Sequence, residues 1–236
     1  MNGWAPGIRE AVTLSRTAWR SMTPQQQWDY ADRLMNQEGG IIATPIDGDM
    51  LTAASYPDSS LCDAYVPGST EPWISELVCA LLKASGRTRV LELGGFMGVT
   101  SAWLALTLEH MGGGSLTVAE WDPEAPERAD WTQARLDALT VPKVEWKVVR
   151  SDALTVIRSF ADESLDFVFC DDDHQKAHVT EEIQTLLPKM TQGGLIVGHD
   201  VYGSCDLQEV FTKFGGYSLD LPRLGTAGGL GMIQIR

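Results

Sequence analysis

Ionisable side chains gather after two apolar segments in the second half of the chain. The run Asp171-Asp172-Asp173-His174 follows segment 165–170, and His199-Asp200 follows segment 195–197. If these segments are neighbouring parallel strands, their carboxyl ends bring the side chains to one edge of a sheet. Two carboxylates placed in this way suit a hard cation such as Mg²⁺, which binds one or two protein carboxylates together with water and substrate oxygens.

A cation at this edge would prepare an oxygen for reaction. It would lower the pKa of a coordinated substrate hydroxyl, and the resulting alkoxide or phenolate is a stronger nucleophile. His174 lies three residues beyond Asp171, near enough to remove the hydroxyl proton. We therefore predict that His174 is a general base.

Two other interpretations of these residues stay open. The run 171–173 could be a solvated acidic loop that caps the helix beginning at Gln175. His174 and His178 are four residues apart and would share a helix face, so a zinc site with His199 is conceivable, although four firm nitrogen or sulfur ligands are not evident. For His178 a purely structural role is the favoured interpretation.

A glycine-rich loop follows the apolar segment 90–93. Gly94, Gly95 and Gly98 would let the backbone turn tightly and approach a ligand, and the next helix would direct its free N–H groups at that ligand. The spacing G-G-x-x-G is an incomplete dinucleotide fingerprint. Glu120 stands 26 residues after Gly94, where an α/β nucleotide binder holds ribose hydroxyls with a carboxylate.

Asp152, after a third strand, adds to the acids at the strand ends. Acids in this position would repel a pyrophosphate, whereas a ligand with ribose, adenine and a positive centre would be tolerated. Each acid taken alone could equally cap the helix that follows it.

The elements that would position these residues alternate regularly from residue 69 onward. Nearly continuous apolar runs such as 165–170 are typical of parallel strands buried on both faces. The last two strands have no helix between them, so the final strand must be antiparallel and joined through residues 223–229. We predict an α/β fold with a doubly wound, mostly parallel seven-stranded sheet. The expected strands are 88–93, 115–120, 144–149, 165–170, 194–199, 217–221 and 230–235, and the expected helices are 72–84, 98–110, 124–139, 153–161, 176–190 and 206–214.

Residues 1–68 are predicted to form a separate N-terminal region ahead of a catalytic domain at 69–236. The first 38 residues have the pattern of two helices, and residues 41–68 lack periodicity. A segment of that length is usually a lid or a binding segment, although a disordered linker is the alternative. The apolar N-terminal helices could pack on a second copy of the chain, so a homo-oligomer is possible.

Composition excludes several classes of partner. Lys and Arg total 18 against 32 Asp and Glu, and the net charge of −14 repels nucleic acid and anionic membrane surfaces. The four cysteines, at 62, 79, 170 and 205, are spaced irregularly, which favours a reduced, cytoplasmic protein. The longest apolar run, 77–82, is far shorter than a membrane span, and the first ten residues lack a signal-like apolar stretch.

The motif Glu92-x-Gly94-Gly95-x-x-Gly98, followed by Glu120 and Asp152, resembles the S-adenosylmethionine site of class I methyltransferases. The resemblance covers about residues 70–236 and includes the late antiparallel strand. It implies that the glycine loop lies under the methionine moiety. The other roles that it implies are these: Thr100 at the carboxylate, Glu120 at the ribose, Trp121 beside the adenine, and Ser151 and Asp152 at the adenine edge.

The segments 169–174 and 193–200 also resemble the metal-dependent small-molecule O-methyltransferases. The catechol and caffeoyl-coenzyme A branches have a lysine as the base, whereas the macrolide-sugar branch has a histidine, which His174 matches. The resemblance implies metal ligands at Asp171, which also belongs to the cofactor site, and at Asp200. Those families have a third ligand, Asn or Asp, next to the second, but Val201 stands there, so His199 or Asp173 would supply it.

The leading hypothesis is an S-adenosylmethionine-dependent, Mg²⁺-assisted O-methyltransferase. Its expected partner is a small-molecule hydroxyl, on a natural-product sugar or, second, a catechol-like phenol. The rival hypotheses are a nicotinamide-dependent oxidoreductase, for which no Ser/Tyr/Lys hydride-transfer set is evident, and a non-catalytic binding protein with the same fold. RNA methylation is disfavoured by the charge.

Overall fold

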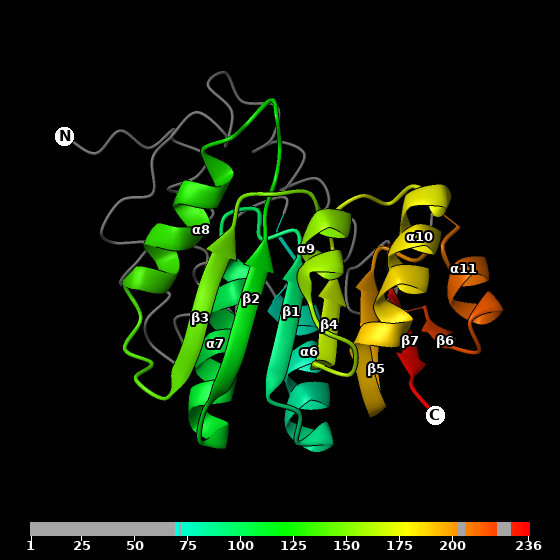
Figure 1. The fold of residues 1–236 in the computed structure, drawn as a ribbon, viewed down its shortest axis with the longest axis horizontal. Coiled ribbons are helices and arrows are strands. Elements are labelled where there is room, and N and C mark those ends of the chain that lie inside the picture. The colour runs from blue at the N-terminus through cyan, green and yellow to red at the C-terminus, as the bar shows by residue number, and fades with distance from the viewer. Residues whose placement is uncertain (1–68, 71, 203–205, 221–227) are drawn as a thin grey trace, which may run out of the picture.

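The computed structural model describes residues 69–70, 72–202, 206–220 and 228–236. Within them, seven strands form one twisted sheet with helices on both faces (Figure 1). The predicted helices of the first 38 residues, the segment 41–68 and most of the connection 223–229 lie outside the described residues. The predicted division at residue 68 therefore stays a prediction.

The elements follow the predicted alternation of helix and strand. In chain order the elements are α6 (Pro72–Ser85), β1 (Arg89–Leu93), α7 (Val99–Met111), β2 (Gly114–Ala119), α8 (Arg128–Asp137), β3 (Val144–Val149), α9 (Ala153–Ser159), β4 (Leu165–Cys170), α10 (Lys176–Leu186), the 3₁₀ turn η2 (Leu187–Lys189), β5 (Met190–His199), α11 (Gln208–Lys213), β6 (Tyr217–Leu219) and β7 (Leu230–Gln234).

The sheet has the strand order β3-β2-β1-β4-β5-β7-β6. All pairs from β3 to β5 are parallel, and β7 is antiparallel to both β5 and β6. The predicted fold class is therefore confirmed, including the late antiparallel strand. The order reverses between β1 and β4, which places the loops after these two strands at the edge where open α/β sheets bind ligands.

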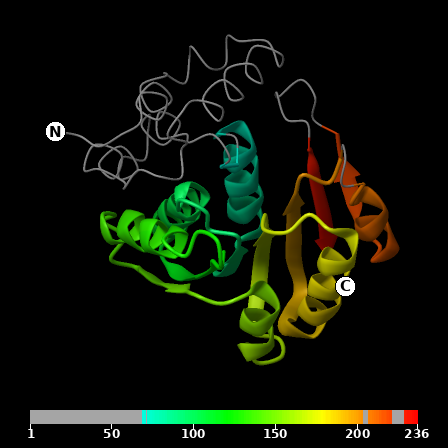
Figure 2. The same cartoon turned by 90° about the horizontal axis from the view of Figure 1, so that it is seen from above.

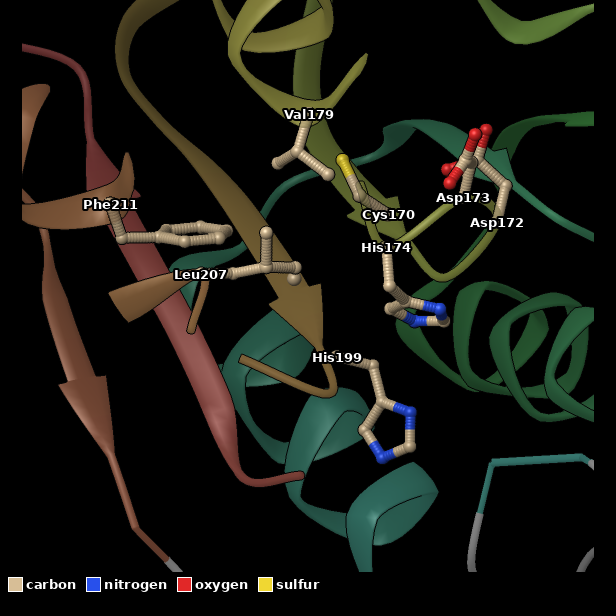
Figure 3. Close-up of a pocket in the computed structure, with 9 residues that line it drawn as sticks. Cys170, Asp172, Asp173, His174, Val179, His199, Leu207 and Phe211 are labelled. Atoms are coloured by element: carbon tan, nitrogen blue, oxygen red, sulfur yellow. The ribbon is translucent and has the colours of Figure 1, made fainter. Parts of the chain in front are cut away.

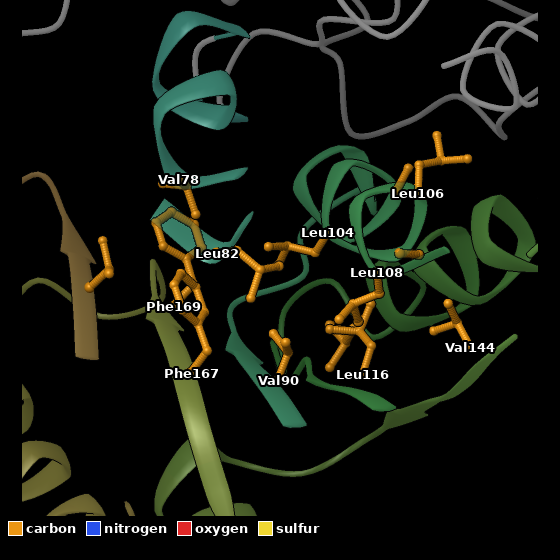
Figure 4. Close-up of a cluster of buried hydrophobic side chains, with 14 of the residues drawn as sticks. Val78, Leu82, Val90, Leu104, Leu106, Leu108, Leu116, Val144, Phe167 and Phe169 are labelled. Atoms are coloured by element: carbon orange, nitrogen blue, oxygen red, sulfur yellow. The ribbon is translucent and has the colours of Figure 1, made fainter. Parts of the chain in front are cut away.

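The core consists of two apolar layers, one on each face of the sheet. Because strand side chains alternate, Phe167 and Phe169 of β4 pack with helices α6 to α8 in one layer, and Val168 packs with α9 to α11 in the other. Figure 2 shows these helix groups on opposite sides of the sheet, and Figure 4 shows the first layer between α6, α7 and β4. The two layers hold the strand ends rigidly, as a site at that edge requires.

Three boundaries differ from the predicted ones by four residues and the others by two or fewer; one of the three is the end of α10, which stops at Leu186 and not at residue 190 because the 3₁₀ turn η2 follows it. Helix α8 begins at Arg128 and not at residue 124, because Pro126 disfavours helical backbone at the residue before it. Strand β5 begins at Met190 and not at 194, because it continues through an irregularity in the register beside the left-handed Gly193. Among the described helices, none is both long and apolar enough to span a membrane.

Candidate active site

Three loops meet at the carboxyl edge of the sheet. Leu93 at the end of β1 pairs with Cys170 at the end of β4, which in turn pairs with Gly198 of β5. The Asp171 backbone N–H donates a 2.9 Å hydrogen bond to the carbonyl of Leu93. The glycine loop and the two acidic segments identified from the sequence are thus direct neighbours.

The side chains of Asp171, His174 and Asp200 form one cluster. One ligand-type atom from each lies within 4.8 Å of the others, which is close enough for all three to bind one cation. His174 Nε2 lies 3.6 Å from Asp171 Oδ1 and 3.8 Å from Asp200 Oδ2, and it is buried without a hydrogen-bond partner. A buried ring nitrogen without a partner is costly unless a ligand or an ion satisfies it.

His199 borders this cluster on the β5 side. Its Nδ1 lies 3.0 Å from Asp171 Oδ1 and 3.6 Å from Asp200 Oδ1. Figure 3 shows the imidazoles of His174 and His199 on the same side of a small pocket, whose apolar wall includes Leu207 and Phe211. The structure places His199 next to Asp171, but the group of possible ligands around Asp171 contains His174 and not His199, so the role of His199 as the third metal ligand stays a prediction.

The charges in this cluster shift its pKa values in opposite directions. Burial alone would raise the pKa of Asp171, but the charge of His199 and the interactions with His174, His199 and Thr70 outweigh it, so the pKa lies well below its usual range. The interaction with Asp171 raises the pKa of His174 against the opposing effect of burial, and Asp200 adds to the increase. Asp171 is therefore an anion throughout the physiological pH range.

Thr70 is part of the site and was not predicted. Its hydroxyl donates a 2.6 Å hydrogen bond to Asp171 Oδ2 and accepts one of 2.9 Å from Thr100. Thr70 and Thr100 are 3% and 6% exposed, so this chain of hydrogen bonds is shielded from water. It fixes the orientation of the Asp171 carboxylate from the side of α7. No sequence signal could have indicated the contact between Thr70 and Asp171, because the two residues are 101 positions apart.

Asp200 occupies an unusual backbone conformation at the end of β5. Its φ of 52° lies in the left-handed region, which costs free energy for a residue other than glycine. Gly228 packs directly against it, and a side chain at Gly228 would overlap the Asp200 carboxylate. Gly228 is a second residue of the site that the sequence analysis missed.

The glycine loop has the predicted tight turn, with φ values of 85° at Gly94 and 74° at Gly98. The glycines meet a packing requirement as well. A Cβ at Gly98 would lie 2.9 Å from the Cα of Thr132, and one at Gly95 would lie 2.7 Å from a methyl group of Val118. The loop therefore lies tightly between α8 and the sheet, and its cofactor contacts stay a prediction.

Glu120 points from the end of β2 toward this loop. Its Oε2 accepts a 2.6 Å hydrogen bond from the Phe96 backbone N–H. Burial raises its pKa, although that hydrogen bond and the charge of Arg128 oppose the increase. Trp121, the next residue, has 54% of its surface exposed, and its contact with adenine stays a prediction.

Glu92 lies beneath the loop and not at its surface. It is 1% exposed, and its Oε2 accepts a hydrogen bond from Ser101 of α7. Burial raises its pKa to about 8, and the negative charges of Asp171 and Glu120 act in the same direction. In this position Glu92 supports the loop, because it connects β1 to α7.

Asp152 shows the capping role that had been left open, whereas Asp173 closes a short turn ahead of α10. Asp152 accepts a 2.9 Å hydrogen bond from the Thr155 N–H at the start of α9, which lowers the pKa of Asp152. Asp173 accepts a 2.9 Å hydrogen bond from the Gln175 N–H ahead of α10, and it does not join the cluster with Asp171. Ser151, which is partly buried, lies beside Asp152 at the end of β3.

His178 belongs to a different group of side chains. It lies with Asp172 and Glu182, and not with His174, among the groups of possible ligands in the described residues. The zinc site considered from the sequence, with His174, His178 and His199 together, is therefore not the arrangement in the structure.

Comparison with known proteins agrees with this arrangement. Residues 91–201 match a family described as a methyltransferase domain. They include the glycine loop, Glu120 and the cluster at Asp171. Residues 91–201 of this chain are thus similar to a methyltransferase domain.

Proteins similar to this chain include one of Mycolicibacterium vanbaalenii that is provisionally named an O-methyltransferase. It is 34% identical over 134 residues, which are 56% of this chain and 55% of the relative. A similarly named protein of Mycobacterium avium is 33% identical over 134 residues. The chain thus spans about half the length of the curated relatives that it matches.

Solved structures share the fold of this chain at low sequence identity. The O-methyltransferase TomG of Streptomyces achromogenes, solved with S-adenosylmethionine, is 20% identical with a TM-score of 0.57, over 81% of this chain and 92% of TomG. An O-methyltransferase of Bacillus cereus, solved with S-adenosylhomocysteine, is 18% identical with a TM-score of 0.58, over 92% of this chain and 100% of that one.

Proposed function

We propose that the protein transfers a methyl group from S-adenosylmethionine to a hydroxyl oxygen of a small molecule, with the help of a divalent cation. The observation that carries the proposal is the shared edge of the sheet. The glycine loop with Glu120 and the cluster with Asp171 meet there through the contact between β1 and β4. A methyl donor and an ionisable hydroxyl would therefore be neighbours.

The cofactor half of the site has the required chemistry. Glu120 can accept hydrogen bonds from ribose hydroxyls, and the exposed ring of Trp121 can stack on adenine. Negative charge at Asp171 and Glu120 suits the positive sulfonium centre and the amino group of the donor. Thr100, Ser151 and Asp152 complete the proposed cofactor contacts, together with Gly94, Gly95 and Gly98, while Glu92 supports the loop from below.

The residues present also fit a divalent cation such as Mg²⁺. Asp171 and Asp200 offer carboxylate oxygens, and His199 offers Nδ1 at 3.0 Å from Asp171 Oδ1 and 3.6 Å from Asp200 Oδ1, which leaves His174 Nε2 available for proton transfer. Carboxylates with water satisfy Mg²⁺, and the imidazole would also accept Mn²⁺ or another transition ion. When bound, the ion would lower the pKa of the acceptor hydroxyl.

His174 would perform the proton transfer. Its Nε2 is buried and has no hydrogen-bond partner, so it can accept the hydroxyl proton as the oxygen forms its bond to the methyl carbon. The bond between sulfur and the methyl group breaks at the same time, and S-adenosylhomocysteine leaves with that electron pair. Asp171 and Asp200 would stabilise the imidazolium that results, because both are within 4 Å of Nε2.

The acceptor that we propose is a sugar hydroxyl of a natural product, and a catechol-like phenol is the second candidate. The histidine in the base position supports the sugar. A cytoplasmic location and a homo-oligomer are also part of the proposal, the former supported by the free, buried thiols of Cys79 and Cys170.

Ligand binding and turnover together test the proposal. We expect S-adenosylmethionine and S-adenosylhomocysteine to raise the melting temperature of the purified protein, since a ligand that binds only the folded state stabilises it. With Mg²⁺ and a panel of sugar and catechol acceptors, S-adenosylhomocysteine should accumulate. A melting-temperature rise with NAD or NADP alone would contradict the proposal and support an oxidoreductase. Cofactor binding without turnover on the panel would favour a binding protein.

A further inference from the structure

A second group of possible ligands lies beside the proposed active site. It consists of Asp172, in the loop after β4, and of His178 and Glu182 on α10. His178 and Glu182 are four residues apart, so they lie on the same face of the helix. Asp172 and His178 have partly exposed side chains, at 21% and 25%, whereas Glu182 is fully buried. The group therefore has a buried floor and a side open to solvent.

The carboxylate of Glu182 is buried with an ion-pair contact to His178 but without a hydrogen bond to any described residue. Its exposed fraction is 0%, and neither of its oxygens has a hydrogen-bond partner in the part of the chain that the structure describes. Burial raises its pKa above the usual range. A buried carboxylate without hydrogen bonds costs several kcal/mol unless a counter-charge compensates it. The structure thus contains a buried acidic side chain that is directed into this group, where its counter-charge is His178 Nε2 at 3.3 Å and its oxygens lack hydrogen bonds from the described residues.

His178 cannot satisfy both carboxylates. Its Nε2 lies 3.3 Å from Asp172 Oδ2 and 3.3 Å from Glu182 Oε1. A ring nitrogen carries at most one proton, and one N–H can point at only one acceptor with good geometry. When the Nε2–H of His178 donates its hydrogen bond to Asp172, Glu182 is left without a hydrogen-bond donor.

The spacing of the three ligand atoms matches a shared cation. Ligands at about 2.1 Å from a metal are separated by about 3.0–3.4 Å in octahedral or tetrahedral geometry. The two distances of 3.3 Å from Nε2 lie in this range, and the third separation is within 4.8 Å. A small closing movement of the exposed Asp172 would complete the set, and water could fill the other positions from the open side.

We propose that Asp172, His178 and Glu182 form a second divalent-cation site, separate from the cluster of Asp171, His174 and Asp200. Because imidazole suits Zn²⁺, Co²⁺ or Ni²⁺ better than Mg²⁺, the site selects a transition-metal ion. Such an ion satisfies the buried carboxylate and joins the loop after β4 to α10. Because Asp172 directly follows Asp171, the ion also fixes the backbone that carries Asp171. This site therefore stabilises the active-site edge of the sheet without contacting the substrates.

Zn²⁺ binding to the full-length protein tests this site, and a double substitution isolates it. In a background with His174→Ala and Asp200→Asn, calorimetry should still show bound Zn²⁺, and Zn²⁺ should raise the melting temperature. Adding Glu182→Gln should weaken that binding roughly tenfold or more, as expected when one of three protein ligands is removed. Mg²⁺ at the same concentration should have little effect on the melting temperature.

Glu181→Gln is the matched control. It removes the same charge one residue away, from a half-exposed side chain whose ion pair with Arg158 should contribute little. This variant should bind Zn²⁺ as its parent does. Any Zn²⁺ that binds to cysteines or to His110 binds equally to both variants, so it does not affect the difference in Zn²⁺ affinity between them.

Two results would overturn the proposal. Equal Zn²⁺ affinity in the Glu182→Gln and Glu181→Gln variants would show that the three side chains form an internal ion cluster without a metal. Saturation by Mg²⁺ as readily as by Zn²⁺ would refute the transition-metal preference. If Glu182→Gln fails to fold by circular dichroism, His178→Gln makes the same test from the exposed side of the site, where substitution does not affect the core.

Discussion

Gly94 lies so close to Asp171 that any side chain at Gly94 would overlap the Asp171 carbonyl oxygen. The φ of Gly94 is 85°, in the left-handed region, so the backbone conformation of the turn after β1 also favours glycine. This contact joins the proposed cofactor loop to the residue at the centre of the carboxylate cluster. The two halves of the site are therefore positioned by one backbone contact.

Replacing Gly94 with alanine should disturb both halves at once. We expect Gly94→Ala to lower the free energy of unfolding by roughly 2 kcal/mol or more, since strain at a left-handed residue adds to the overlap with Asp171. Denaturant unfolding measures the loss. Gly86→Ala is the matched control, because Gly86 has a φ of 66° and nothing within 4 Å of an added Cβ. Equal losses in the two variants would show that the contact with Asp171 is unimportant.

The sheet could be predicted because its strands carry their signal locally. The predicted strands 144–149 and 165–170 coincide with β3 and β4. Strand β4 is a mostly apolar run that is buried along its whole length, and the edge strand β3 alternates apolar with charged residues at its start, which is a strand pattern too. Strand β5 was predicted too short because Gly193, which signals a turn, lies inside it.

The site could be predicted only where its residues directly follow a strand. Asp171, His199 and Glu120 were identified in this way. Thr70 and Gly228 were not, because their contacts with the site depend on how distant segments pack. The sequence also could not indicate that His178 and His174 belong to different clusters. The two histidines lie on either side of the start of α10, so the helical spacing of four residues does not apply to them.

Glu120 should determine cofactor affinity. A carboxylate that accepts hydrogen bonds from ribose hydroxyls contributes roughly 1.5–3 kcal/mol for each bond. We expect Glu120→Ala to weaken S-adenosylmethionine binding at least about tenfold, measured by calorimetry. Glu124→Ala, in the exposed loop that follows, should bind the cofactor normally. Unchanged affinity in the Glu120 variant would remove this residue from the site.

Glu92 should make stability depend on pH in a defined direction. Its pKa is about 8 in the folded protein and about 4.5 in an ordinary environment, so the folded state binds more protons between these values. The stability that protonated Glu92 contributes is therefore lost as pH rises from about 5 to 8. Glu92→Gln should be more stable than the wild type by at least about 1 kcal/mol at pH 8, with a smaller difference at pH 5. A difference that stays constant over this range would mean that Glu92 is ionised in the fold.

Chelation should separate the metal from the cofactor. If Asp171 and Asp200 bind the catalytic ion, EDTA should abolish turnover and Mg²⁺ or Mn²⁺ should restore it, with little change in S-adenosylmethionine affinity. Restoration by Mg²⁺ assigns the effect to this cluster, because the site at Glu182 is expected to prefer transition ions. Full turnover in protein shown to be metal-free by elemental analysis would refute the catalytic role of the ion.

His174 should control the rate and its pH dependence. Removing a general base costs typically 10²–10⁴-fold in rate, whereas the bound substrates stay in position. We expect His174→Ala to lower kcat by this amount with little change in KM. His110→Ala, at the exposed end of α7, should behave like the wild type.

The pH profile distinguishes the base from a metal ligand. Asp171 raises the pKa of His174 above its usual value, so the neutral, basic form increases as pH rises through that raised value. Wild-type kcat should rise over the same interval, and the alanine variant should lose this step and be partly rescued at high pH, where the hydroxyl ionises unaided. A variant within a few-fold of the wild type would point to His199 as the base. A variant that loses the metal would make His174 a ligand, because its Nε2 already faces Asp171 and Asp200 at 3.6 and 3.8 Å.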